Sequence, residues 1–247
     1  MFRLAYNGVP APSFMKITSV DQSVTPEITH YNTVLPGNFG DLDGGVHYGK
    51  KEFTVNYTII YDGVNDLSYY TDKITKWLKI GTTNVYPLTL DTSDYYYKAR
   101  PSEVSELRDM LFYATGSIKF TASNPRRYKK TSTAVTLNVD GTSTEVSYAG
   151  LVDAPCFITL ECGSGTTSVK VTNSAKGESI IVTGNISGTL YIDTKALVVK
   201  INNVWRMDLV NINTDWFKIY ANATNKISIV AEGTGVTSAK LTFTEAN

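Results

Sequence analysis

The residue types that most often carry catalysis or bind metal ions are scarce in this 247-residue chain, which has two histidines and two cysteines. His30 and His47 do not form a metal-binding pair four residues apart on a helix, and neither lies near a cysteine pair. The chain also lacks the Gly-x-Ser-x-Gly motif of a nucleophilic serine and the glycine-rich motif that cradles phosphate. We therefore interpret both histidines as surface residues.

The two cysteines are placed unfavourably for a disulfide bond. Cys156 and Cys162 flank a strand-like segment, Phe157 to Glu161. They would lie roughly 20 Å apart in a fully extended strand, at about 3.3 Å per residue. A disulfide needs Cα atoms within about 7 Å. We expect two buried free thiols. The cellular compartment is then either reducing or one whose redox state does not affect this chain.

Carboxylates offer two further kinds of chemistry. The segment Asp41-Leu42-Asp43-Gly44 has the acidic character of a calcium loop, but it lacks the ligand alternation and the closing Glu of an EF-hand. Glu161, Glu178 and Asp193 would be a glycosidase pair only if two of them lay about 5–10 Å apart. We interpret all of them as ordinary strand and turn acids. The sequence therefore predicts no catalytic residue, no metal and no cofactor.

The charge balance argues against nucleic acid as a partner, and the lengths of the apolar runs argue against a membrane. Lys and Arg number 23, as do Asp and Glu, so the formal net charge is +0 and nothing indicates general nucleic-acid binding. The basic cluster at 126–130 is interpreted as a solvated linker. The N-terminus lacks the pattern of a signal peptide, and no apolar run is long enough to span a membrane. We expect no sequence-specific nucleic-acid binding and no membrane insertion.

Apolar periodicity predicts the elements of the first half. Residues 52–61 alternate as a strand with Phe53, Val55, Tyr57 and Ile59 on one face. An apolar stripe predicts an amphipathic helix over about 66–80, with Asn65 or Asp66 as its cap. A hairpin is expected over 85–99 and a strand over 118–122. The segment 103–113 fits either a helix or a strand.

A glycine-rich segment, residues 36–49, precedes the first clear strand. It has five glycines in fourteen positions, which favours a flexible loop. A long loop in a compact domain is usually functional or ordered by a partner. We therefore expect residues of this loop to contact another subunit. The candidate contact residues are Gly37, Asn38, Phe39, Asp41, Asp43 and Gly45.

The second half reads as nearly pure β structure. Short strands are expected at 134–139, 156–162, 167–172, 178–183, 188–193, 196–201, 216–220, 226–231 and 238–243. Such spacing without helices is typical of a β-sandwich or jelly roll. The sequence thus predicts a mainly β chain of two domains, residues 1–130 and 131–247. Trp205, Trp216 and Tyr191 could bind carbohydrate if exposed, but we expect them in the core.

The order of features in the first half resembles the siphophage tail-component family, whose members are distal tail proteins. The resemblance covers roughly residues 14–130. It rests on the glycine-rich segment, the strand Glu52 to Ile60, the helix ending in Trp77-Leu78, the hairpin 86–100 and the segment Gly116 to Pro125. In the second half Ala154-Pro155, the segment 188–194 and the segment 223–229 resemble the family's C-terminal β domain. Ala223 stands where a Gly is more usual.

The resemblance implies a structural role in a virion rather than an enzyme. Distal tail proteins form hexameric rings at the tail tip, with a ring-forming N-terminal domain and a galectin-like C-terminal β-sandwich. The implied partners are the tail tube protein, the tail-associated tip protein and a receptor-binding or adhesion protein. The implied location is the distal tail tip or baseplate of a siphovirus or prophage, with synthesis in the bacterial host cytoplasm. The alternative is a carbohydrate-binding module that contacts the host cell wall.

Overall fold

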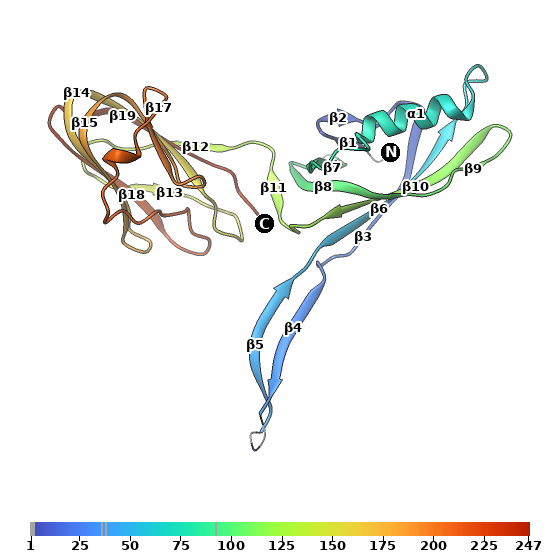
Figure 1. Cartoon of the computed structure of the whole chain (residues 1–247), viewed down its shortest axis with the longest axis horizontal. Helices are drawn as coiled ribbons and strands as arrows, with labels where there is room; N and C mark the ends of the chain where they lie inside the picture. The colour runs from blue at the N-terminus through green and yellow to red at the C-terminus, as the bar shows by residue number, and fades with distance from the viewer. Residues whose placement is uncertain (1–2, 36, 38, 92) are drawn as a thin grey trace. The chain divides into compact units, whose positions relative to one another are not determined.

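The computed structural model describes residues 3–35, 37, 39–91 and 93–247, which divide into two compact units, Met1–Arg127 and Tyr128–Asn247. Figure 1 shows that strands dominate both units, and this confirms the expected mainly β fold. In the described part of the chain, no helix has the length and apolar character needed to cross a membrane.

Among the described residues, the N-terminal unit has a main antiparallel sheet, a separate two-stranded sheet and one α-helix. Its strands are β1 (Leu4–Tyr6), β2 (Val9–Pro10), β3 (Met15–Gln22), β4 (Ile28–Val34), β5 (Asp41–Tyr48), β6 (Lys51–Ile60), β7 (Tyr86–Leu90), β8 (Tyr95–Val104), β9 (Arg108–Asp109) and β10 (Tyr113–Ala122). The main sheet has the order β2-β1-β7-β8-β10-β6-β3, with β9 on β10 and β11 (Arg127–Lys129) on β8. Strands β4 and β5 form a separate two-stranded sheet.

The core of this unit lies between the sheet and α1 (Leu67–Leu78). The predicted alternation of β6 is confirmed, because Phe53, Val55, Tyr57 and Ile59 are all buried. The segment 103–113, for which helix and strand both remained open, continues β8 to Val104 and forms the short strand β9.

The start of α1 is fixed by a side-chain cap. The Asp66 carboxylate accepts a hydrogen bond of 3.0 Å from the backbone N–H of Tyr69, which otherwise has no partner within the helix. Asp66→Ala is expected to lower the free energy of unfolding of the N-terminal unit by about 1 kcal/mol. Urea unfolding followed by circular dichroism measures this loss.

Asp66→Asn is the matched control, because asparagine caps helices about as well as aspartate. It should retain the stability of the unsubstituted chain. Equal losses in the two variants would contradict the capping role.

The C-terminal unit is dominated by two long strands. Its elements are β12 (Thr133–Thr136), β13 (Thr144–Val146), β14 (Cys156–Asn173), β15 (Glu178–Asp193), β16 (Val198–Ile201), β17 (Val204–Trp205), the 3₁₀ helix η1 (Met207–Leu209), β18 (Asn225–Glu232) and β19 (Val236–Phe243). The first part of β14 pairs with β19 and the second part with β18, so one bent strand serves both sides of the unit. Its inward side chains form a separate core.

The expectation of four separate short strands between residues 156 and 193 is wrong. Residues 156–162 and 167–172 belong to the single strand β14, and 178–183 and 188–193 belong to β15. Glycines between these expected strands bend the long strands and do not end them: Gly165 and Gly188 have positive φ of 98° and 88°, and the β14–β15 register shifts near Gly165. The expected strand at 216–220 is only an isolated bridge between Ala154 and Ile219.

Candidate interaction site, an exposed two-stranded arm

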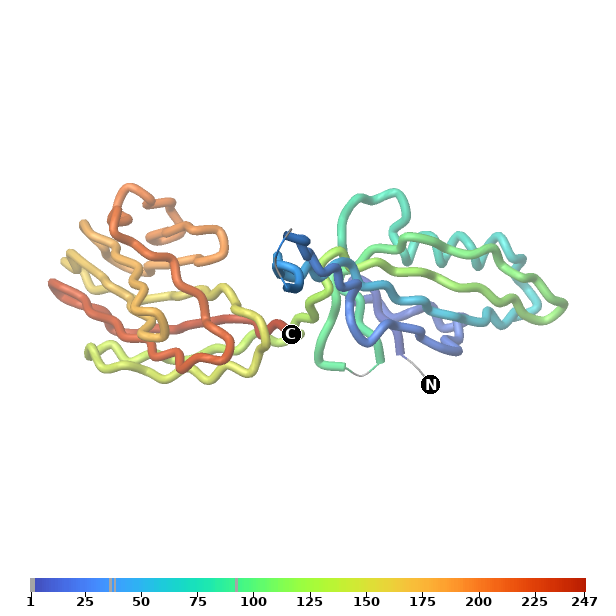
Figure 2. Tube along the Cα trace, turned by 90° about the horizontal axis from the view of Figure 1, so that it is seen from below, coloured from blue at the N-terminus to red at the C-terminus, as the bar shows by residue number. Residues whose placement is uncertain are grey.

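Strands β4 and β5 form a ribbon that we call the arm, residues 28–48. Figure 1 shows the arm extending away from the main sheet, and Figure 2 views it nearly along its length. Its register joins Ile28 to Tyr48 at the base and Val34 to Asp41 near the tip. Every described residue of the arm is exposed except Gly45, which is partly buried. The arm therefore has no core of its own.

The expectation of a flexible loop at 36–49 is wrong, because Asp41–Tyr48 is strand β5. Its two adjacent glycines serve a β-bulge rather than a loop, since the register shifts between His30 and Asn32. A Cβ on Gly44 would lie 2.7 Å from the carbonyl oxygen of Tyr31, and Gly45 has a φ of 99°. The close approach and the positive φ explain the glycines without requiring a loop.

The candidate contact residues occupy the tip and one strand of the arm. Gly37 and Phe39 lie in the connection at the tip, and Asp41, Asp43 and Gly45 lie in β5. Asn38 lies outside the described residues. Sequence reasoning missed the other half of the arm, β4, although its content of Ile, Val, Thr and Tyr favours a strand and could have indicated it.

The arm exposes an unusual amount of apolar surface. Its exposed large apolar side chains are Ile28, Tyr31, Val34, Leu35, Phe39, Leu42, Val46 and Tyr48. They occur on both faces, since the Ile28–Tyr48 pair and the Thr33–Leu42 pair point to opposite sides of the ribbon. An isolated two-stranded ribbon is marginally stable in water, and exposed apolar patches mark interaction sites. The arm has the properties of a segment that another molecule covers.

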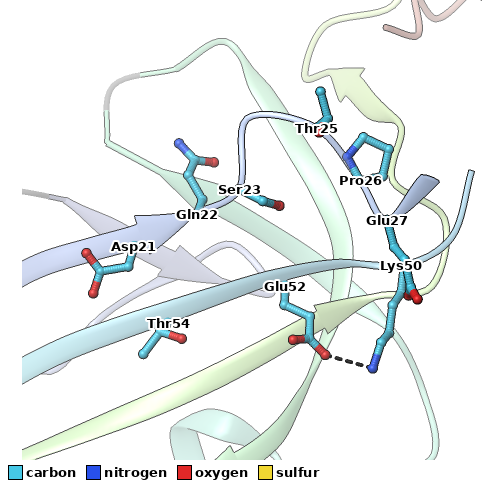
Figure 3. Close-up of a pocket in the computed structure, with 9 residues that line it drawn as sticks. All are labelled: Asp21, Gln22, Ser23, Thr25, Pro26, Glu27, Lys50, Glu52 and Thr54. Atoms are coloured by element: carbon cyan, nitrogen blue, oxygen red, sulfur yellow. Dashed lines mark ion pairs between the residues drawn. The ribbon is translucent and has the colours of Figure 1, made fainter.

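The root of the arm lies where the long β3–β6 ladder is interrupted. Pro26 cannot donate a ladder hydrogen bond, and the strands separate around an open groove of about 690 Å³ (Figure 3). Two backbone bonds close the root: Glu27 N–H to Lys50 O at 3.3 Å, and Gly49 N–H to Glu27 O at 2.7 Å. The two strands therefore leave the sheet as a pair.

Charged side chains line the β6 side of this groove. Glu52 accepts from Lys50 at 2.8 Å and from Lys119 at 2.9 Å, and Figure 3 marks the first of these ion pairs. The hydrogen bond from Lys50, and then that from Lys119, lowers the pKa of Glu52 below its ordinary value. Because all three side chains are partly exposed, these pairs add little to stability and orient the side chains at the root.

The residues considered for catalysis are dispersed. His30 and His47 both lie on the exposed arm, in register with Val46 and Thr29 respectively. Glu161 accepts from the Thr189 hydroxyl at 3.0 Å. Glu178 accepts from the hydroxyl of Tyr220, and Asp193 accepts from two backbone N–H groups in the turn after β15. Among the described residues, no group of three His, Cys, Asp or Glu could hold a metal ion.

Cys156 and Cys162 are both buried and free, as expected. Burial raises the pKa of Cys156 to about 12 and that of Cys162 to about 11. The reactive thiolate is therefore scarce at pH 8, and the side chains are inaccessible. We expect Ellman's reagent at pH 8 to leave the folded chain unmodified and to label two thiols after unfolding in urea. Rapid labelling of the folded chain would contradict this.

The aromatic residues considered for carbohydrate binding differ in their surroundings. Trp216 is partly buried against the core, whereas Trp205 is 60% exposed on β17, so the expectation of a core position is wrong for Trp205. Tyr191, Lys200 and Trp205 are in register across β15, β16 and β17, so their side chains share one face. That face is the outer one, because the neighbouring positions in these strands are buried.

On the same outer face the Phe157 ring stacks on Tyr191 at 6.2 Å, and the Lys200 ammonium lies 4.8 Å from the centre of the Trp205 ring. We call Phe157, Tyr191 and Trp205 the aromatic strip. Tyr191 and Phe157 are partly buried and Trp205 is exposed, so part of each ring is accessible to an external molecule.

Comparison with known proteins yields two family matches. Residues 7–122 match the domain described as phage tail protein RIFT-related domain. Residues 149–246 match the domain described as siphovirus-type tail component, C-terminal domain. Together these matches extend over most of the chain and fall in its two units. No curated protein sequence matches the chain.

Solved structures share the fold over the full length. The crystal structure of the SPP1 Dit (gp 19.1) protein, described as a paradigm of the hub adsorption apparatus in phages that infect Gram-positive bacteria, has a TM-score of 0.84. It is 15% identical, with 100% of this chain and 99% of that chain covered. Chains of the phage p2 baseplate in its activated conformation, with Sr or with Ca, have TM-scores of 0.53 and 0.52. Each is 8% identical, with 99% of this chain and 97% of that chain covered.

Proposed function

The chain belongs to the siphovirus-type phage tail component family, and we propose that it is the structural hub of a tail tip. It is a phage tail protein with a mainly β fold. The resemblance of its sequence to distal tail proteins and the shared fold with the SPP1 hub protein support the hub role. The arm is the observation that carries the proposal, because an exposed ribbon with apolar residues on both faces needs a neighbour.

The hub takes the form of a ring, with six copies as the family resemblance implies. The arm belongs to the N-terminal unit, so that unit makes the contacts between copies. A contact between two different surfaces of identical subunits repeats around an axis and closes when the rotation fits. Gly37, Asn38, Phe39, Asp41, Asp43 and Gly45 are proposed contact residues. The units Met1–Arg127 and Tyr128–Asn247 would then serve as ring domain and outer domain.

The partners follow from this place in the virion. The ring joins the tail tube protein and the tail-associated tip protein, and the C-terminal unit carries the receptor-binding or adhesion protein. The protein is made in the bacterial host cytoplasm and ends at the distal tail tip. We assign it no catalytic reaction, no cofactor and no binding to nucleic acid or membrane, since binding surfaces suffice for a hub.

Size-exclusion chromatography with light scattering tests the hub proposal. We expect the purified chain to elute as a single species of six times the subunit mass at high protein concentration. A chain that stays monomeric across the accessible concentration range, both alone and with the tail tube protein, would contradict the proposal.

A second candidate function is binding of a cell-wall carbohydrate, and the exposure of Trp205 favours it. Aromatic ring faces beside hydrogen-bonding side chains suit the apolar faces of sugar rings. If the strip binds sugar, the chain retains a glycan on a glycan array and Trp205→Ala abolishes the signal. Phe112→Ala, which removes an exposed aromatic ring from the other unit, is the control and should retain it. Absence of any retained glycan would exclude this function for the glycans tested.

A further inference from the structure

A second apolar surface lies at the opposite end of β6 from the arm. It is formed by the loop after β6, the first turn of α1 and the β9–β10 connection. We call Ile60, Val64, Tyr69, Leu111 and Phe112 the loop-end surface. Val64, Leu111 and Phe112 are 87%, 84% and 75% exposed. Most of the exposed large apolar side chains of the N-terminal unit belong either to the arm or to this end of the sheet.

The loop-end surface is held in place by its own hydrogen bonds. The backbone N–H of Tyr61 donates to Phe112 O at 3.3 Å, and the Tyr61 hydroxyl donates to Asp109. The Asp62 carboxylate accepts from the N–H groups of Val64 and Asn65 at 2.9 and 3.0 Å. These bonds order both loops before any partner binds, which lowers the entropy lost on association.

Beside the loop-end surface lies an open depression of about 480 Å³ with aromatic walls. Phe14, Tyr61 and Tyr70 line it, and the Tyr70 ring lies 5.0 Å from Phe14 and 5.5 Å from Tyr61. Such a depression suits an aromatic or branched apolar side chain. The tip of the arm presents one in Phe39, whose side chain is fully exposed.

A subunit cannot cover its own loop-end surface with its own arm. The arm leaves the sheet at the start of β6, and the loop-end surface follows the end of β6, ten residues or roughly 30 Å away. Figure 1 shows the arm, β4 and β5, directed away from the end of the sheet at which β9 lies. Folding back would break the hydrogen bonds between Glu27, Lys50 and Gly49 at the root. The arm that reaches this surface therefore comes from another copy.

The loop end carries side chains of both charges. Its carboxylates lie in local hydrogen bonds, since Asp62 and Asp66 accept backbone N–H groups and Asp109 accepts a hydroxyl. In the described part of the chain, Lys16 and Arg108 at this end form no ion pair. The arm carries acidic residues near its tip.

Those acidic residues are Asp41 and Asp43, which likewise form no ion pair among the described residues. Opposite charges at the rim of an apolar contact fix its register and speed association.

We propose that the arm of one copy docks on the loop-end surface of the next copy, with Phe39 near the aromatic depression and Asp41 and Asp43 toward Lys16 and Arg108. This inference rests on the proposed ring and specifies its contact. Because each subunit presents both the arm and the receiving surface, every contact leaves one free arm and one free surface for the next subunit.

A complementation experiment tests this pairing. The first variant replaces residues 28–48 by Asn-Gly and keeps the loop-end surface. The second, Leu111→Asp with Phe112→Asp, keeps the arm. Leu111 and Phe112 are exposed and the arm contains no core residue, so neither variant loses core contacts. Equal melting temperatures of the two variants verify that both fold. Each variant alone should have the mass of one subunit. An equimolar mixture should have the mass of two, because one intact arm meets one intact surface.

Val230→Asp is the control for adding charge, since Val230 is 55% exposed on the C-terminal unit, and it should leave the ring intact. Rings formed by the Leu111→Asp, Phe112→Asp variant would overturn this docking surface while leaving the hub proposal in place. A mixture that stays monomeric would do the same. An intact chain that forms no ring, either alone or with the tail tube protein, would refute the hub proposal and the docking inference with it.

Discussion

A chain in which residues 28–48 are replaced by an Asn-Gly turn is expected to fold normally and to lose all ring formation. The replacement is geometrically simple, because Gly49 N–H already bonds to Glu27 O at 2.7 Å and the strand ends are adjacent. An Asn-Gly pair closes such a hairpin in a type I′ turn. The measured mass should fall from six subunits to one.

Folding should survive because the arm contributes nothing to the core. None of the core residues of the N-terminal unit lies between Ile28 and Tyr48. Calorimetry should therefore give the same melting temperature within a few degrees, apart from any stabilisation that the ring itself supplies. Phe39→Ser is a milder companion that removes the largest apolar side chain of the tip. Rings of unchanged mass from the arm-deleted chain would refute the role of the arm.

Phe120→Ala is expected to destabilise the N-terminal unit by about 3–5 kcal/mol. Phe120 is fully buried in β10, pairs in register with Phe53, and its ring lies 5.4 Å from that of Tyr6. Alanine would leave a cavity among these rings, and the closely paired strands on either side cannot collapse to fill it. For a unit of this size, the melting temperature should fall by roughly 4 °C for each kcal/mol.

The effect should be confined to one unit. The two units have separate cores, so calorimetry should show one lowered transition and one unchanged transition. Val24→Ala is the control, because Val24 is 95% exposed and lies outside both proposed contact surfaces, so its loss should change stability by less than about 0.5 kcal/mol. A common shift of both transitions would contradict independent cores.

Strong periodicity made some elements predictable from the sequence. The alternation of Phe53, Val55, Tyr57 and Ile59 identified β6, and the stripe ending at Trp77-Leu78 identified α1. In both cases one face is buried, and burial of one face enforces the period that the sequence displays.

Glycines misled the prediction, because a glycine can bend a strand as well as end it. Gly44 and Gly45 make a bulge in β5, and Gly165 lies at a bulge in β14. Whether a strand continues past such a glycine depends on its partner strand, which is distant in sequence. Local composition therefore suggested a loop in the arm and four short strands where β14 and β15 run.

The interaction surfaces were only partly predictable. The length and glycines of the segment 36–49 predicted a contact segment, whereas no pattern predicted its partner strand β4. An exposed ribbon has no buried face, so its alternation carries no clear pattern. The loop-end surface and the exposure of Trp205 depend on which side chains the fold leaves uncovered, and this became apparent only with the strands in register.

Electron microscopy of the purified intact chain tests the central claim most directly. We expect class averages of closed rings with six copies, and no rings from the chain with residues 28–48 replaced. Particles of single subunits from the intact chain, both alone and with the tail tube protein, or rings that persist without the arm, would contradict a hub assembled through this arm.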